Sequence, residues 1–105
     1  MPYFVYVIKL DKKVQKSKKF RDHNPQMKMR KACLYVGQTC HNPETRFQQH
    51  KEGYKSNSFV KRFGLKLKPR FYNKYNPIKT RTEAERIEQQ LTEKLRRNGY
   101  GVWSN

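Results

Sequence analysis

The clearest helical pattern in the sequence is Thr82-Glu83-Ala84-Glu85-Arg86-Ile87-Glu88-Gln89-Gln90-Leu91-Thr92-Glu93-Lys94-Leu95. Its apolar side chains recur three or four residues apart, at Ala84, Ile87, Leu91 and Leu95. That spacing places them in one stripe along a helix, and such a stripe has to pack against a core. We therefore expect a long helix here that covers the hydrophobic core of the protein.

Glu88 lies inside this apolar stripe. At about 100° per residue it falls beside Ala84, Leu91 and Leu95. The other acids of the segment point elsewhere, namely Glu83, Glu85 and Glu93. A carboxylate that faces a core is costly unless a positive group meets it. That group could be a basic side chain or a metal ion, and a metal ion would suggest phosphate chemistry.

The composition indicates one small folded domain over residues 1–105 with a heavily basic surface. Only 34% of the residues are hydrophobic, but 13% are aromatic, and aromatic side chains bury large areas. Lys and Arg total 25 against 8 acids, which leaves a formal net charge of +17. Such a charge is typical of a nucleic-acid-binding domain. A solubilising role and contact with anionic lipid are the alternatives.

We expect a cytoplasmic protein without a membrane partner. No apolar run approaches the ~20 residues that a membrane span needs, and residues 1–9 lack the basic start and cleavage site of a signal peptide. The two cysteines, Cys33 and Cys40, suggest a reducing compartment. Their spacing to each other and to His41 matches no zinc motif. We expect Cys33 in a strand and Cys40 in a turn.

The remaining periodicity predicts an α+β fold, with a small three-stranded, mainly antiparallel sheet flanked by helices. Strands are expected at residues 3–10, at 33–36 with Gly37 as the end, and at 65–68, where 70–72 could continue the strand. Helices are expected at 43–51 after Asn42, from Ser56 or Ser58 to Arg62, and from a Thr82–Glu85 capping box to Arg97. Residues 100–103 could form a short strand or coil.

Residues from 11 to about 32 form a basic loop or arm between the first two expected strands. The segment 11–31 holds nine Lys or Arg residues and few apolar ones. Lysine acts as a point charge on phosphate, so we expect this arm to track a nucleic-acid backbone rather than to read bases. The candidate phosphate-binding residues are Lys12, Lys13, Lys16, Lys18, Lys19, Arg21, Lys61 and Arg62.

Two strand motifs that contain tyrosine precede a helix with two functional candidates. The motifs are Phe4-Val5-Tyr6 and Tyr35-Val36-Gly37-Gln38-Thr39. The helix that follows carries Arg46 and His50, four residues apart and therefore on one face. Glu88-Gln89-Gln90-Leu91 and the tail Gly99-Tyr100-Gly101-Val102-Trp103 come later. In this order and over nearly its whole length, the chain resembles the GIY-YIG nuclease superfamily. The departures from the family pattern are Phe4 for glycine, Val5 for isoleucine and Gln38 where some branches have lysine.

The resemblance implies a role for each of six residues. Tyr6 would activate the attacking water, with His50 as its proton acceptor. Tyr35 would orient the water or hold the phosphate, and Arg46 would stabilise the charge of the transition state. Glu88 would be the single protein ligand of Mg²⁺, or of Mn²⁺ in its place. Asn105 would support the phosphate, and it is preferred to Asn98, which falls in the last helical turn.

The resulting prediction is a metal-dependent endonuclease that hydrolyses DNA phosphodiester bonds at one active site per chain. RNA remains open as a substrate, and the protein would act as a monomer or a homodimer. The alternatives are a non-catalytic nucleic-acid-binding module of the same fold and a basic structural protein of the ribosomal type. Taken singly, Tyr6 and Tyr35 could be core residues, and Glu88 could be a buried partner of an arginine.

Overall fold

The computed structural model describes residues 2–104, which fold around one four-stranded sheet. The strand order is β3-β1-β2-β4, with bounds Phe4–Leu10 for β1, Cys33–Thr39 for β2, Gly64–Leu67 for β3 and Gly101–Ser104 for β4. β1 pairs antiparallel with β2 and β3, whereas β4 pairs parallel with β2. The α+β class is confirmed. The expectation of three strands is wrong, because residues 101–104 form a fourth.

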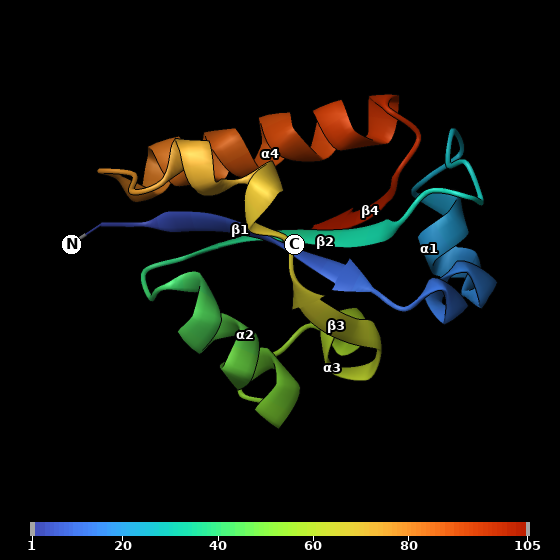
Figure 1. Cartoon of the computed structure of the whole chain (residues 1–105), viewed down its shortest axis with the longest axis horizontal. Coiled ribbons are helices and arrows are strands. Elements are labelled where there is room, and N and C mark those ends of the chain that lie inside the picture. Colours follow the sequence, from blue (N-terminus) through green and yellow to red (C-terminus); the bar gives the residue numbers. More distant parts are fainter. Residues whose placement is uncertain (1, 105) are drawn as a thin grey trace.

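Helices cover both faces of this sheet (Figure 1). Their bounds are Lys18–Asp22 for α1, Pro43–Glu52 for α2, Ser58–Phe63 for α3 and Arg81–Arg97 for α4. The ribbon shows α4 above the sheet, and α2 and α3 below it. α1 lies beside the end of β1 and the beginning of β4. Coverage on both faces explains why β1 is apolar throughout its centre, with residues 5–8 all buried. Among the described residues, no helix has both the length and the hydropathy to cross a bilayer.

Helix starts follow the expected chemistry but differ by a few residues from the expected positions. Asn42 caps α2 by accepting a hydrogen bond from the Thr45 N–H, as predicted. α3 is capped by Asn57 rather than by a serine, and α4 is capped by Thr80 rather than by Thr82. Any short polar side chain at the turn entering a helix can accept these N–H groups. The sequence alone therefore leaves several candidates for each cap.

The basic segment after β1 differs from the expected loop or arm. It forms a single-turn 3-10 helix at Lys12–Lys16 and then α1, and each of these buries one side chain completely, Val14 and Phe20. Asn24 is also buried, and its Oδ1 accepts a hydrogen bond from the Val102 N–H of β4. The segment is thus anchored in the core. Residues 70–72, which could have continued the third strand, instead lie in a pair of 3-10 turns, Pro69–Phe71 and Asn73–Tyr75, with Tyr72 between them.

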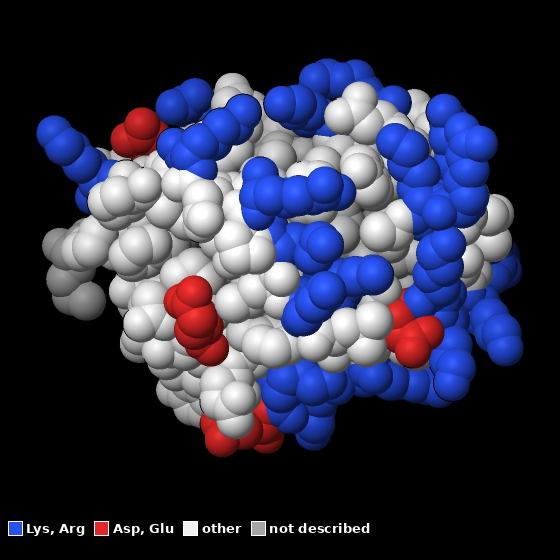
Figure 2. Space-filling view, in the orientation of Figure 1, with Lys and Arg blue, Asp and Glu red and all other residues white. Residues whose placement is uncertain are grey.

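Basic side chains dominate the visible surface. Figure 2, in the orientation of Figure 1, shows Lys and Arg gathered on the side where α1 lies, with few acidic residues among them. The formal net charge is +17 over 105 residues. A surface of this sign attracts polyanions and repels other cations.

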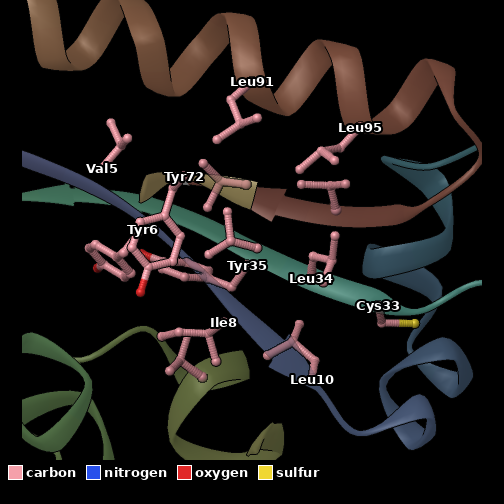
Figure 3. Close-up of a cluster of buried hydrophobic side chains, with 14 of the residues drawn as sticks. Val5, Tyr6, Ile8, Leu10, Cys33, Leu34, Tyr35, Tyr72, Leu91 and Leu95 are labelled. Atoms are coloured by element: carbon pink, nitrogen blue, oxygen red, sulfur yellow. The ribbon is translucent and has the colours of Figure 1, made fainter. Parts of the chain in front are cut away.

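The core lies between α4 and the sheet and continues beneath β1. Leu91 and Leu95 project from α4 toward the strands (Figure 3), and together with Ala84 they are buried as the apolar stripe predicts. Glu88 lies on the same side of the helix and is only 8% exposed. The prediction that this carboxylate faces the interior is therefore confirmed.

Candidate active site

Four of the predicted catalytic residues line one pocket of about 180 Å³. β1 and β2 supply Tyr6 and Tyr35, α2 supplies Arg46, and α4 supplies Glu88. Three further residues complete its wall, namely Gly37, Gln38 and Glu85. The pocket thus brings together residues from the two central strands and from helices on opposite faces of the sheet.

The pairing of β1 with β2 determines how the two tyrosines meet. Tyr6 pairs across the strands with Gly37, two residues after Tyr35, and the two rings have centroids 6.1 Å apart. Both are almost fully buried and lie at the same end of the core in Figure 3. Gly37 was expected to end β2, but the strand continues to Thr39. A Cβ atom at Gly37 would lie 2.5 Å from Tyr6 Oη and 2.6 Å from Cζ, so the phenol occupies the space that a side chain would need.

His50 stands behind Tyr6 rather than in the pocket wall. It is fully buried, and its Nε2 lies 2.9 Å from Tyr6 Oη. The Asn57 N–H donates to the other ring nitrogen, Nδ1, at 3.4 Å. Burial lowers the pKa of His50 to about 4, and the positive charge of Arg46 adds to this, so the ring is neutral near pH 7. A neutral ring has one N–H, and the tautomer protonated at Nε2 would let Nδ1 accept from Asn57 and Nε2 donate to Tyr6.

Arg46 is held in place by backbone carbonyls as well as by its helix. Its Nη1 donates to Tyr54 O at 3.1 Å and to Gln49 Oε1 at 3.2 Å, and its Nη2 donates to Lys55 O at 2.8 Å. A guanidinium has five N–H donors, so these bonds leave some of them for a ligand. The charge also acts on Tyr6, whose pKa it lowers against a larger increase caused by burial.

Glu88 is a buried carboxyl group whose pKa lies well above its usual value. Burial raises the pKa of its carboxyl group to about 7, and the neighbouring charge of Glu85 adds to this. None of the ion pairs within residues 2–104 involves Glu88. The basic partner that would have explained a buried carboxylate is therefore not found in the described part of the chain. The carboxylate instead faces a pocket that it shares with two phenols and a guanidinium.

A sequence model described as the GIY-YIG catalytic domain matches residues 2–101. The chain belongs to the GIY-YIG family. This is a family of nucleases, which hydrolyse phosphodiester bonds in nucleic acids. A search of curated proteins and a search of solved structures found no match.

The GIY-YIG pocket also contains residues that the sequence analysis did not assign to the site. Glu85 was expected to point away, but it lies at the rim of the pocket, although its carboxylate pairs with Arg81 at 3.4 Å. Its position three residues before Glu88 is the signal that could have identified it. Gln38 lines the pocket beside Gly37. Asn105, expected as the late asparagine, lies outside the described residues, and Asn98 is the exposed C-cap of α4.

The predicted phosphate-binding residues of this GIY-YIG chain divide into two groups. Lys13, Lys16 and Arg62 line a second hollow between the 3-10 helix and α3. The other five contact the protein itself. Lys12 and Arg21 donate to backbone carbonyls, Lys18 pairs with Asp22, Lys19 lies over the Trp103 ring, and Lys61 lies beside Gly53.

Proposed function

We propose that this chain is a Mg²⁺-dependent endonuclease that hydrolyses DNA phosphodiester bonds at one active site. The observation that carries the proposal is Glu88, a buried carboxylate without an ion-pair partner among the described residues, in one pocket with Tyr6, Tyr35 and Arg46. Membership of a nuclease family makes phosphodiester hydrolysis the expected chemistry.

The donor set fits a hard cation that takes most of its ligands from water and substrate. Glu88, with Glu85 at the rim, would hold Mg²⁺, or Mn²⁺ in its place, because carboxylate oxygens suit both ions. Within residues 2–104 no three acidic, histidine or cysteine side chains gather as a metal cage. Mg²⁺ is usually bound through one or two carboxylates together with phosphate oxygens and waters. When bound, it would polarise the scissile phosphate and offset the charge that develops there.

The chain's own residues would position the phosphate and handle the proton of the attacking water. In hydrolysis the water oxygen bonds to phosphorus, a bond from phosphorus to a sugar oxygen breaks, a proton leaves the water and the departing sugar oxygen takes up a proton. Arg46 would hold a non-bridging phosphate oxygen with the N–H groups that its carbonyl contacts leave available. Tyr35, beside Tyr6, would orient the water.

Tyr6 would act as the base or relay only after losing its own proton. Burial is the largest cause that raises the pKa of Tyr6, and Tyr35 raises it further. In the tautomer of His50 that is protonated at Nδ1, His50 Nε2 would accept the phenolic proton. In the tautomer protonated at Nε2, that proton would leave toward Tyr35 or the pocket. The His50 Nε2–H would then stabilise the phenolate. This role is the alternative to the expected one, in which His50 accepts the proton.

Plasmid nicking tests the proposal directly. Supercoiled plasmid should be nicked with Mg²⁺ and not with EDTA. Glu88→Ala should abolish nicking while DNA binding persists, and Tyr6→Phe should lose most of the activity without a large fall in melting temperature. Glu93→Ala, an exposed acid on the same helix, is the matched control. Nicking by Glu88→Ala at the wild-type rate would exclude the assigned role of this residue.

A non-catalytic nucleic-acid-binding module is the second candidate. The observation that favours it is the engagement of Arg46, which makes three hydrogen bonds to its own chain. The same assay separates the two functions. Tight DNA binding without nicking, in Mg²⁺ and in Mn²⁺, would establish the binding module.

A further inference from the structure

A second hollow lies apart from the active-site pocket, between the 3-10 helix at Lys12–Lys16 and α3. Its volume is about 620 Å³, within the range of about 300–1,000 Å³ that is usual for ligand pockets. Cationic side chains line it from both elements, namely Lys13, Lys16 and Arg62. One acid, Asp11, also lines it, and its Oδ1 accepts a hydrogen bond from the Lys13 N–H.

The cations of this hollow are available to a ligand. The ammonium groups of Lys13 and Lys16 are exposed and make no hydrogen bond or ion pair with residues 2–104. Nearby basic residues are engaged by the protein, as Lys18 is by Asp22. Because the ammonium groups of Lys13 and Lys16 have no partner among residues 2–104, the hollow favours an anionic ligand.

The wall of the hollow is aromatic as well as cationic. Phe63 is half-buried, lies nearly parallel to Phe59 with ring centroids 6.5 Å apart, and has the Arg62 guanidinium 5.1 Å from its ring centre. To bind the phosphates of a duplex, the site would need only its cationic side chains. Sites that bind unpaired nucleotides combine cations for the phosphates with aromatic or guanidinium surfaces on which bases stack.

The hollow and the active-site pocket lie at different points along β1. Tyr6 and Asp11 are five residues apart along β1 and its end, which is about 17 Å in extended chain. Since a nucleic-acid strand advances about 3.4 Å per nucleotide even when stacked in a duplex, this length of chain corresponds to a few nucleotides of substrate.

We propose that the hollow of Lys13, Lys16, Arg62 and Phe63 binds an unpaired nucleotide of the nucleic-acid substrate, a few nucleotides from the scissile phosphate. The lysines take the phosphate, and the base stacks on Phe63 or on the Arg62 guanidinium. This inference rests on the proposed function in taking nucleic acid as the ligand. It adds a preference for substrates with a single-stranded segment beside the cleavage site.

Binding in EDTA tests the site without any cleavage. Fluorescence anisotropy would compare a DNA duplex that carries a single-stranded tail of about five nucleotides with a blunt duplex of the same total number of nucleotides. The wild-type chain should bind the tailed DNA about tenfold more tightly. Lys13→Ala with Arg62→Ala should remove that preference, and Phe63→Leu should reduce it without a change in charge.

The control variant combines Lys66→Ala with Lys79→Ala, which removes the same charge from two exposed residues outside the hollow. It should keep the preference for the tailed DNA. Equal binding of both DNAs by the wild type, or equal weakening of both by the hollow variant, would overturn the proposal. A tail preference in a chain that never nicks plasmid would refute only the nuclease function. Nicking without a tail preference would refute only this site.

Discussion

At position 37 the Tyr6 phenol occupies the place that a side chain would take. The register that pairs Tyr6 with Gly37 brings the phenol across β2 and toward Arg46 and Glu88. Gly37 therefore contributes to the site because its missing side chain leaves room for the Tyr6 phenol. The motif Tyr35-Val36-Gly37 combines a pocket tyrosine, a core valine and this space.

Gly37→Ala should impair activity more than stability. The added methyl group meets Tyr6 Oη and Cζ, so the phenol has to move, at a stability cost of about 1–3 kcal/mol. We expect at least about a hundredfold slower nicking, since small displacements of reacting groups are costly. Val36→Ala is the matched control, because it destabilises the same strand without touching the phenol. Nicking and melting temperature measure the two effects, and equal activity losses in both variants would contradict the close-approach argument.

Glu88 should make the stability of the metal-free protein depend on pH. Its pKa rises on folding from 4.5 to about 7, so between these values the folded chain holds a proton that the unfolded chain has lost. Stability contributed by this group is therefore present at low pH and lost as the pH rises to about 7. Glu88→Gln should match the wild type near pH 4 and exceed its stability at pH 8, by up to about 3 kcal/mol.

Thermal unfolding in EDTA from pH 4 to 8 measures this difference, and Glu93→Gln serves as the control. Adding Mg²⁺ at pH 8 should raise the melting temperature of the wild type and not that of Glu88→Gln, because a bound ion stabilises only the state that binds it. If the melting temperatures of wild type and Glu88→Gln change with pH in parallel, burial of the Glu88 carboxylate does not lower the stability.

The start of α4 illustrates what decides an element boundary. Both Thr80 and Thr82 have an acid three residues later, so each fits a capping box. In the fold Thr80 has extended backbone and accepts the Glu83 N–H at 3.1 Å, whereas Thr82 is inside the helix. The conformation of the chain before the helix therefore decides which of the two threonines is the cap.

Thr80→Ala should lower the stability by about 1 kcal/mol, because it leaves the Glu83 N–H without its acceptor. Thr82→Ala should change it by less than about 0.5 kcal/mol, as is usual for exposed helix positions. Urea unfolding of the two variants provides the comparison. A larger loss in Thr82→Ala would place the helix start two residues later.

At the scale of the whole molecule, the charge acts on folding and on binding with opposite signs. A formal net charge of +17 is confined to a body with a radius of gyration of 12.9 Å. The Debye length is about 10 Å at 0.1 M salt and about 3 Å at 1 M, so salt screens repulsion across the protein. The same screening weakens contacts with phosphates.

Added NaCl should therefore raise the melting temperature while it weakens DNA binding. We expect the melting temperature to rise between about 0.05 and 0.5 M NaCl because self-repulsion falls. The logarithm of the DNA affinity should fall linearly with the logarithm of the salt concentration. Deleting residues 12–31 is unsuitable for such a test, since Val14 and Phe20 belong to the core. A melting temperature that falls with salt would show that repulsion does not limit stability.

The sequence by itself determined the features that depend on near neighbours. The helical stripe with Glu88 inside it, the apolar β1 and the Asn42 cap follow from residues within a few positions of each other. The motif order was sufficient to identify the family. Only the tertiary structure decided the fourth strand, the place of Glu85 and the contacts of the His50 ring. Each of these depends on a contact that the spacing of neighbouring residues does not specify. Examples are the pairing of β2 with β4 and the contact of the His50 ring with the Asn57 N–H.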